Sequence, residues 1–229
     1  MARSVLAAPA LLVVLTLLGA GRLARANPAP ASPAGGRVLQ VLAQIRDTLR
    51  VTRYQHPTVI RPRAGVYLWD CSGMAAWVLR QAAPVSRRAL ASPRPVARDF
   101  FHAIDRAPTV GVRGGWTRLA GLADARPGDV LAWLRPPDWP RRNTGHVGFL
   151  LAAPAPVPGL PGAWALRIAD ATSIPHQDDT RSWPGEGGYG EGTILLFADA
   201  AGQPTHYGWH GTRAGATAET RIVLGRLVR

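Results

Sequence analysis

Cys71 is the only cysteine among 229 residues, and its surroundings favour nucleophilic chemistry. It lies in the stretch WDCSGMAAWVL, where the polar residues Asp70 and Ser72 flank it and an apolar, helix-forming run follows. This run predicts a helix from Cys71 to about Ala82, which places the thiol at a helix N-terminus, where free backbone N–H groups and the helix dipole favour an anion. We therefore expect a thiolate with a lowered pKa that attacks near neutral pH. The alternative interpretation of a lone cysteine is a small buried hydrophobe.

A cysteine nucleophile needs a general base within reach, and His146 is the best placed of the six histidines. It lies in the sequence GHVG, which predicts a strand whose alternation puts the imidazole on one face and Val147 on the other. We expect the flanking glycines, Gly145 and Gly148, to leave room for the thiol or for substrate. The alternative is an ordinary half-buried strand histidine.

The group that orients the base is predicted to be a carboxylate, Asp170, which ends an apolar strand. A carboxylate on a strand beside His146 could accept the ring N–H and fix the tautomer. Asp170 could equally cap the next turn, and His176, six residues on, is a weaker substitute for the same role.

Three further residues are candidates for substrate binding. The Tyr54 hydroxyl could lie near Cys71, and so could the side chains of Asp70 and Ser72. Asp70 and Ser72 also fit the role of capping residues for the helix that follows them.

The composition bears on partners and cofactors. The formal charge is +13, all 27 basic residues are arginine, and no zinc-finger spacing, aromatic ribonucleoprotein signature or dense basic run accompanies them. We therefore expect an anionic envelope polymer rather than nucleic acid as partner. No HExxH or other compact ligand spacing is present, so no metal or other cofactor is expected.

The first residues predict export. Residues 5–20 are almost wholly apolar, and Ala24-Arg25-Ala26 is a small-x-small cleavage pattern, so residues 1–26 read as a signal peptide cleaved after Ala26. The predicted location is secreted or periplasmic, with no membrane anchor after cleavage; an uncleaved anchor is the alternative. Residues 27–36 (NPAPASPAGG) read as a disordered linker, and residues 37–229 as one catalytic domain without an internal disulfide.

The spacing of apolar residues changes along the chain, from a helical period in the first half to a strand-like alternation in the second. The predicted helices cover residues 37–51, 71–82 and 96–104, whereas the predicted strands cover residues 129–134, 145–151, 163–171, 193–198, 206–210 and 221–228. Residues 54–66 read as a proline-broken loop and residues 185–192 (GEGGYGEG) as a flexible loop. Helices followed by strands predict an α+β fold in which helices pack on one antiparallel sheet.

Three motifs in order resemble those of the NlpC/P60 cysteine peptidases: DCSGM at residues 70–74, RPGDV at 126–130 and GHVGF at 145–149. The resemblance covers roughly residues 37–173. It implies a papain-like α+β fold, hydrolysis of amide bonds in peptidoglycan stem peptides through a thioester, and Cys71, His146 and Asp170 as nucleophile, base and orienting residue.

The resemblance also implies a pocket that binds the free amino end of a stem peptide. The chain differs from the usual family pattern at two points. Tyr54, Asp70 and Ser72 would bind the free amino end of a stem peptide, although the Trp-Gly-Gly usual after such a tyrosine is missing. Members of the family often carry histidine at the position of Asp170.

Two other functions fit the same residues. The first is a papain-like acyltransferase or amidase that acts on another substrate. The second is a non-catalytic envelope-binding protein, whose sugar-stacking residues could be Trp133, Trp139, Trp183 and Trp209.

Overall fold

The chain forms helices mainly in its first half and strands mainly in its second. The computed structural model describes residues 28–140 and 143–228. The helices are α1 (Pro33–Thr48), α2 (Cys71–Ala82), α3 (Pro84–Arg88) and α4 (Ala97–Asp105), and the 3-10 turns are η1 (Pro62–Ala64), η2 (Leu122–Asp124) and η3 (Gly211–Arg213). The strands are β1 (Val51–Tyr54), β2 (Val59–Arg61), β3 (Val66–Trp69), β4 (Trp116–Arg118), β5 (Val130–Leu134), β6 (Gly145–Leu150), β7 (Ala155–Pro156), β8 (Ala163–Thr172), β9 (Gly188–Ala198), β10 (Pro204–Gly208), β11 (Ala218–Glu219) and β12 (Ile222–Leu227).

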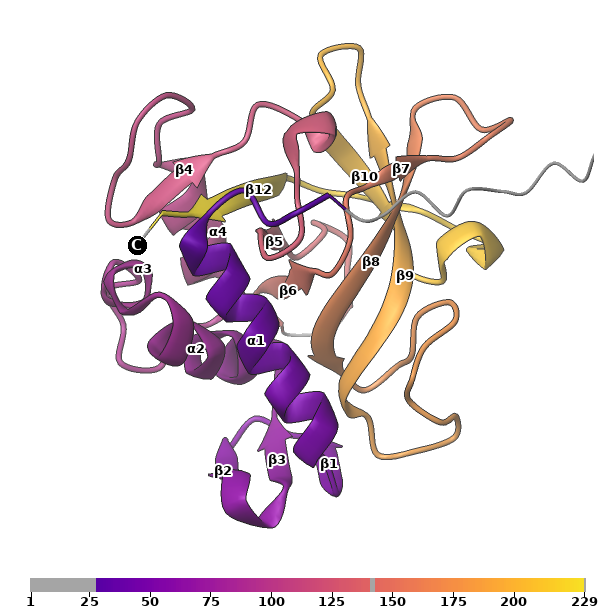
Figure 1. Ribbon diagram of the computed structural model, residues 1–229. Coiled ribbons are helices and arrows are strands. Elements are labelled where there is room, and N and C mark those ends of the chain that lie inside the picture. Colours follow the sequence, from indigo (N-terminus) through magenta and orange to yellow (C-terminus); the bar gives the residue numbers. More distant parts are fainter. Residues whose placement is uncertain (1–27, 141–142, 229) are drawn as a thin grey trace, which may run out of the picture.

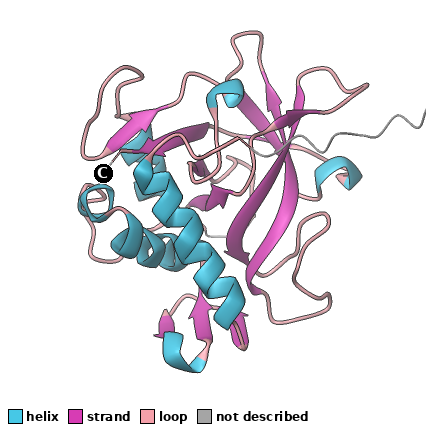
Figure 2. Cartoon of the chain, viewed as in Figure 1, coloured by secondary structure: helices cyan, strands magenta, loops and turns pink. Residues whose placement is uncertain are grey.

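Two sheets organise these strands (Figure 1). The larger has nine strands in the order β11-β10-β9-β8-β6-β5-β12-β4, with β7 paired to β8, and its pairings are antiparallel. The smaller has the order β1-β3-β2, with β1 and β3 parallel. The helices gather on one side of the large sheet, as Figure 2 shows. The predicted α+β class with an antiparallel sheet is confirmed, and the small second sheet was not predicted.

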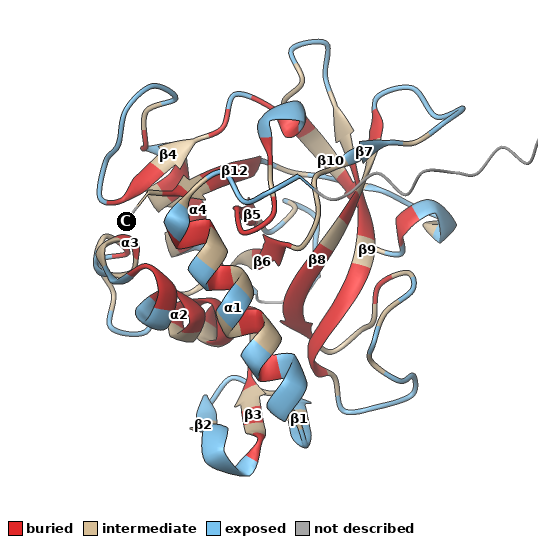
Figure 3. Cartoon of the chain, viewed as in Figure 1, coloured by how far each residue is buried: buried red, intermediate tan, exposed pale blue. Residues whose placement is uncertain are grey.

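Each face of the large sheet carries its own core. On β5, Val130 and Ala132 point to the core beneath α1, α2 and α4, whereas Leu131 and Trp133 point to a second core formed with β8, β9, β10 and β12. A strand buried on both faces reads as a continuous apolar run, which is what VLAWL is. Figure 3 shows buried residues along most of β8 and β9, the two longest strands.

Helix α1 begins earlier than the sequence predicted. The Ser32 side chain caps it by accepting the N–H of Gly35 at 3.0 Å, and Pro33 occupies the first turn, where a missing N–H costs nothing. Residues 33–36 are therefore helix, and the predicted linker of residues 27–36 is wrong for that part.

The predicted loop at residues 54–66 is also wrong, because β2 and η1 lie within it. Strand β3 pairs with β1 and with β2, so that Tyr54 lies beside Trp69 in register. These strands are only three or four residues long, too short for the alternation that marks a strand in sequence.

The glycine-rich stretch at residues 185–192 is not a flexible loop over its last five residues. Gly188 to Gly192 are the buried start of β9, paired with β8 from Thr172 to Ile168. Glycine lowers strand propensity, but here it leaves space that other side chains fill, as described below.

The predicted signal peptide at residues 1–26 lies outside the described residues. Within residues 28–140 and 143–228, none of the helices combines the length and the apolar character needed to cross a membrane.

Candidate active site

Cys71 is the first residue of α2, as the sequence predicted. Asp70 is extended (φ −96°, ψ −179°) and caps the helix, since its Oδ1 accepts the N–H of Gly73 at 2.7 Å and the hydroxyl of Ser72 at 2.9 Å. Asp70 therefore fulfils the capping role that the sequence left open, and Ser72 supports it by donating its hydroxyl to the capping carboxylate. Cys71 itself is 7% exposed.

Helix α2 packs on β6, which brings Cys71 beside Val147, the neighbour of His146 in the chain. Burial raises the pKa of the Cys71 thiol, and the nearby backbone N–H groups of Val147, the residue after His146, and of Ser72 oppose that effect. A helix N-terminus and a strand 75 residues later in the chain thus meet at the thiol.

His146 is held on three sides. Its Nε2 lies 2.6 Å from Asp170 Oδ2, and its ring lies 4.8 Å from that of Trp133 and 5.1 Å from that of Trp209. An ionised carboxylate only accepts, so Nε2 carries the hydrogen and Nδ1 is the nitrogen left with a lone pair. This tautomer is the one that a base acting through Nδ1 requires.

The glycines beside His146 have a different role from the one predicted. A Cβ on Gly145, whose φ is +127°, would overlap the carbonyl of Trp133. A Cβ on Gly148 would come within 3.3 Å of the Asp170 Cβ. These glycines let β5 and β8 approach β6 closely, and they do not make room for thiol or substrate.

Asp170 is fully buried on β8 and binds three side chains. Its Oδ2 also accepts from His176 Nε2 at 2.8 Å, and its Oδ1 accepts from Arg181 Nη2 at 2.8 Å. Asp170 is thus the direct partner of His146, and His176 lies behind it rather than replacing it. The side chain is not merely a cap for the next turn.

Arg181 and its partner Asp179 were not predicted from the sequence. Arg181 Nε and Nη2 donate to the two carboxylate oxygens of Asp179 at 2.8 and 2.7 Å, and its side chain is only 4% exposed. A Cβ on Gly190 would overlap the Arg181 side chain, and one on Gly192 would overlap Asp179 and His176. The signal was available: Gly188, Gly190 and Gly192 alternate, which in a strand leaves one face without side chains.

The charges around Asp170 fix its ionisation. Burial is the largest influence and would raise the pKa of this carboxyl, but the charges of Arg181 and His176 and the hydrogen bonds from both histidines hold that pKa well below its usual value. Asp170 is therefore a carboxylate at neutral pH.

The predicted low pKa of Cys71 is wrong. Burial, and secondly the charge of Asp70, raise the pKa of the thiol, and the N–H of Val147 offsets them only in part. Burial also lowers the pKa of His146, against the opposing effect of Asp170. The resting pair is therefore a neutral thiol beside a neutral imidazole, because desolvation outweighs the helix dipole.

His146, Asp170 and His176 each offer a ligand atom within 4.8 Å of the others, the arrangement of a possible metal site. The two N–O separations, 2.6 and 2.8 Å, are hydrogen-bond lengths, whereas two ligands each about 2.0 Å from one tetrahedral ion lie about 3.3 Å apart. The remaining carboxylate oxygen faces a guanidinium. This geometry fits a hydrogen-bonded cluster rather than a ligand set.

Tyr54 and Asp70 lie where the β1–β3 sheet leads into α2. Tyr54 pairs with Trp69, next to Asp70 in the chain, and its ring lies 6.0 Å from that of His56. His56 Nδ1 lies 3.1 Å from Asp70 Oδ2, on a side chain that is 79% exposed. His56 was not predicted, since a lone histidine before a proline carries no pattern.

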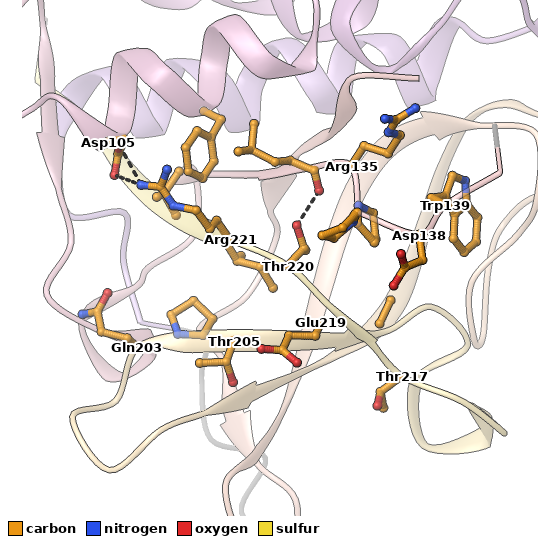
Figure 4. Close-up of a pocket in the computed structure, with 18 of the residues that line it drawn as sticks. Asp105, Arg135, Asp138, Trp139, Gln203, Thr205, Thr217, Glu219, Thr220 and Arg221 are labelled. Carbon is orange, nitrogen blue, oxygen red and sulfur yellow. Dashed lines mark hydrogen bonds and ion pairs between the residues drawn. The ribbon is translucent and has the colours of Figure 1, made fainter. Parts of the chain in front are cut away.

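Two cavities are lined by residues other than the cysteine. The larger, of about 1010 Å³, lies between α4, the 135–139 segment and β10 to β12; Figure 4 shows Asp105 bound to Arg221 on one side of it and Asp138 and Trp139 on the other. The smaller, of about 390 Å³, is lined in part by Arg181 and Tyr189. Cys71, His146 and Asp170 line neither.

The four candidate stacking tryptophans do not share one environment. Trp133 is buried and Trp209 half-buried beside His146, whereas Trp139 and Trp183 are 40% and 65% exposed. They do not form one exposed platform.

Comparison with known proteins adds one relative. The chain is 28% identical over 205 residues to an uncharacterized protein of Acanthamoeba polyphaga mimivirus, with 77% of this chain and 88% of that protein covered. No protein-family model matches the chain. No solved structure matches it either.

Proposed function

We propose that the protein is an exported cysteine hydrolase of the NlpC/P60 type, with a papain-like fold, that cleaves amide bonds in peptidoglycan stem peptides. The observation that carries the proposal is the junction of α2 and β6, where the Cys71 sulfur lies against the N–H of Val147 and the neighbouring His146 is fixed by Asp170. Nucleophile, base and orienting group thus come from a helix N-terminus and two adjacent antiparallel strands.

The chemistry begins with both groups neutral. His146 Nδ1 takes the thiol proton as Cys71 Sγ bonds to the amide carbon, whose carbonyl electron pair moves onto oxygen. The Cys71 N–H at the helix N-terminus and the Tyr54 hydroxyl are the proposed donors to that oxyanion. Collapse breaks the C–N bond, and His146 gives its proton to the departing amine.

Hydrolysis of the thioester repeats these steps with water. His146 Nδ1 accepts a proton from water as its oxygen attacks the thioester carbon. The C–S bond then breaks and His146 returns the proton to the departing sulfur, which releases the acid and restores the thiol. Asp170 stays a carboxylate throughout and stabilises the transient imidazolium.

Substrate recognition would centre on Asp70. Its Oδ1 is committed to the helix cap, so a positively charged amino end would bind Oδ2, which His56 occupies. A stem peptide with a free amino end would therefore displace His56, while the arginine-rich surface would attract the anionic wall polymer.

The test is digestion of purified peptidoglycan and of free stem peptides by the chain from Asn27 onward, read by mass spectrometry. Cys71→Ser keeps the size of the side chain and Cys71→Ala removes its polar atom. New fragments from the wild type and none from either variant support the proposal and identify the bond.

Two other outcomes would change the assignment. Condensation products in the presence of added amines, with no hydrolysis, would indicate an acyltransferase that uses the same thioester. Sedimentation of the protein with peptidoglycan, without any covalent change of substrate or of Cys71, would indicate a binding protein.

A further inference from the structure

We propose that His176 and Arg181 are positioning residues that act as a two-cation clamp on Asp170, so that Asp170 holds His146 as the Nε2–H tautomer with Nδ1 left as the basic nitrogen. The inference rests on the proposed function for its role, but its structural content stands on the hydrogen bonds of the buried cluster alone. Neither residue belongs to the nucleophile, base and orienting group assigned above.

The partners of His176 define its protonation. Its Nε2 lies 2.8 Å from Asp170 Oδ2 and its Nδ1 lies 3.1 Å from the carbonyl oxygen of Trp209. A carbonyl oxygen and a carboxylate oxygen can only accept, so both ring nitrogens must carry hydrogen. His176 is therefore an imidazolium, although its side chain is fully buried.

Arg181 supplies the second cation, and the loop before it is built to hold it. Asp179 Oδ2 accepts the backbone N–H of His176 at 2.7 Å, and Oδ1 accepts that of Arg181 at 2.8 Å. Asp179 thus folds residues 176–181 into one unit and at the same time binds the guanidinium. Arg181 Nη1 donates to the carbonyl of Gly188, which ties the unit to β9.

The buried charges balance. Asp170 from β8 and Asp179 from the loop face His176 and Arg181, while β6 contributes His146 and β9 contributes the side-chain-free positions Gly190 and Gly192. Two anions and two cations make a neutral cluster, which limits the cost of burying it. Removing one cation leaves an uncompensated carboxylate beside the base.

The clamp fixes the orientation of the Asp170 carboxylate and, through it, the tautomer of His146. Two donors on Asp170 Oδ2 and one on Oδ1 leave the carboxylate a single orientation, which fixes the Nε2–H tautomer of His146. The positive charges of His176 and Arg181 also disfavour a second proton on His146, so the ring remains a base at lower pH.

The first experiment requires no substrate and no variant. Side-chain 15N NMR of the wild-type protein at pH 7 should show hydrogen on both ring nitrogens of His176 and on Nε2 alone of His146. A neutral His176 at pH 7, or a His146 protonated on Nδ1 alone, would overturn the proposal.

The second experiment uses Arg181→Gln, with Arg213→Gln as the matched control, because Arg213 lies at the surface and pairs only peripherally with Asp178. We expect the acid limb of the pH profile of Cys71 alkylation by iodoacetamide to move up by about half to one unit in Arg181→Gln, which lowers the rate on that limb about threefold to tenfold. The control should follow the wild type.

Alkylation and NMR separate this inference from the proposed function. An unchanged profile in folded Arg181→Gln alongside normal peptide cleavage would refute the clamp and leave the hydrolase intact. A shifted profile in a protein that cleaves no peptidoglycan would support the clamp and refute the hydrolase. If Arg181→Gln does not fold, the NMR measurement on the wild type still tests the clamp, through the protonation of His176 and the tautomer of His146.

Discussion

Burial raises the pKa of the Cys71 thiol and the nearby backbone N–H of Val147 lowers it, so the thiol lies beside the residue that follows the proposed base. The contact joins α2 to β6 and leaves the thiol buried and neutral. Deprotonation must then accompany attack rather than precede it, which makes the reaction depend on His146.

His146→Gln tests that dependence. The substitution removes the basic nitrogen and keeps a polar side chain, so peptide cleavage at pH 7 should fall by about 10²-fold or more. His102→Gln on α4 is the control and should retain wild-type rates. Cleavage by His146→Gln within a few-fold of the wild type would show that another group deprotonates Cys71.

Cys71 alkylation should rise with pH in the wild type and show no fast plateau in acid. The pKa of the thiol is raised by burial and that of His146 is lowered, so no thiolate–imidazolium pair is stored at rest. Stopped-flow measurement with iodoacetamide between pH 4 and 9 checks this. A rate that stays high and flat below pH 6 would demonstrate a preformed ion pair and contradict the neutral resting state.

Asp170→Asn should destabilise the fold by about 3 to 5 kcal/mol, because Arg181 and His176 lose the carboxylate that compensates their buried charges. The pH dependence has a definite sign. The folded-state pKa of Asp170 lies well below its usual value, so its contribution is present above about pH 4 and is lost as pH falls through the folded pKa. Urea unfolding from pH 3 to 7 should therefore show a shallower acid-side loss in Asp170→Asn; equal slopes would contradict it.

How far the sequence predicted the fold differs from element to element. Helix α2 and strands β6 and β8 were found at nearly their observed bounds, because long apolar runs and a polar cap mark them clearly. The sheet of β1 to β3 was not predicted because its strands are short and prolines lie in the segments between them. Residues 188–192 were misread because glycine signals a loop unless the side chains that fill its space are known.

Some residues of the candidate site could be predicted from the sequence and others could not. Cys71, His146 and Asp170 could be named from local motifs; the structure pairs His146 with Asp170 and places Cys71 beside Val147. Arg181 and Asp179 could not be predicted, because a charged pair in a segment without regular secondary structure leaves no repeating pattern in the sequence. The thiol pKa was misjudged because burial depends on what packs over the helix N-terminus, which no local pattern shows.

Asp70→Ala should cost about 1 kcal/mol of stability through loss of the α2 cap, and should also abolish the preference for peptides with a free amino end. Ser32→Ala, which removes the cap of α1, is the matched control: similar destabilisation with unchanged cleavage. Acetylation of the peptide amine should slow the wild type but not slow Asp70→Ala further. If acetylation of the peptide and Asp70→Ala lowered the cleavage rate additively, Asp70 would not be the group that binds the amine.

His56→Ala should lower the KM for stem peptides with a free amino end and leave kcat unchanged, because it frees Asp70 Oδ2 for the substrate. Steady-state kinetics beside the surface control His210→Ala measure this. A raised KM would mean that His56 contacts substrate itself rather than competing with it.

In the proposed mechanism, Cys71 forms a thioester with the acyl part of a cell-wall peptide. Acid-quenched wild-type protein mixed with stem peptide should carry, by intact-mass and fragment analysis, a hydroxylamine-labile adduct on Cys71 equal to the acyl fragment, and Cys71→Ser should lack the thioester. Peptide cleavage that continues in Cys71→Ala would contradict the account.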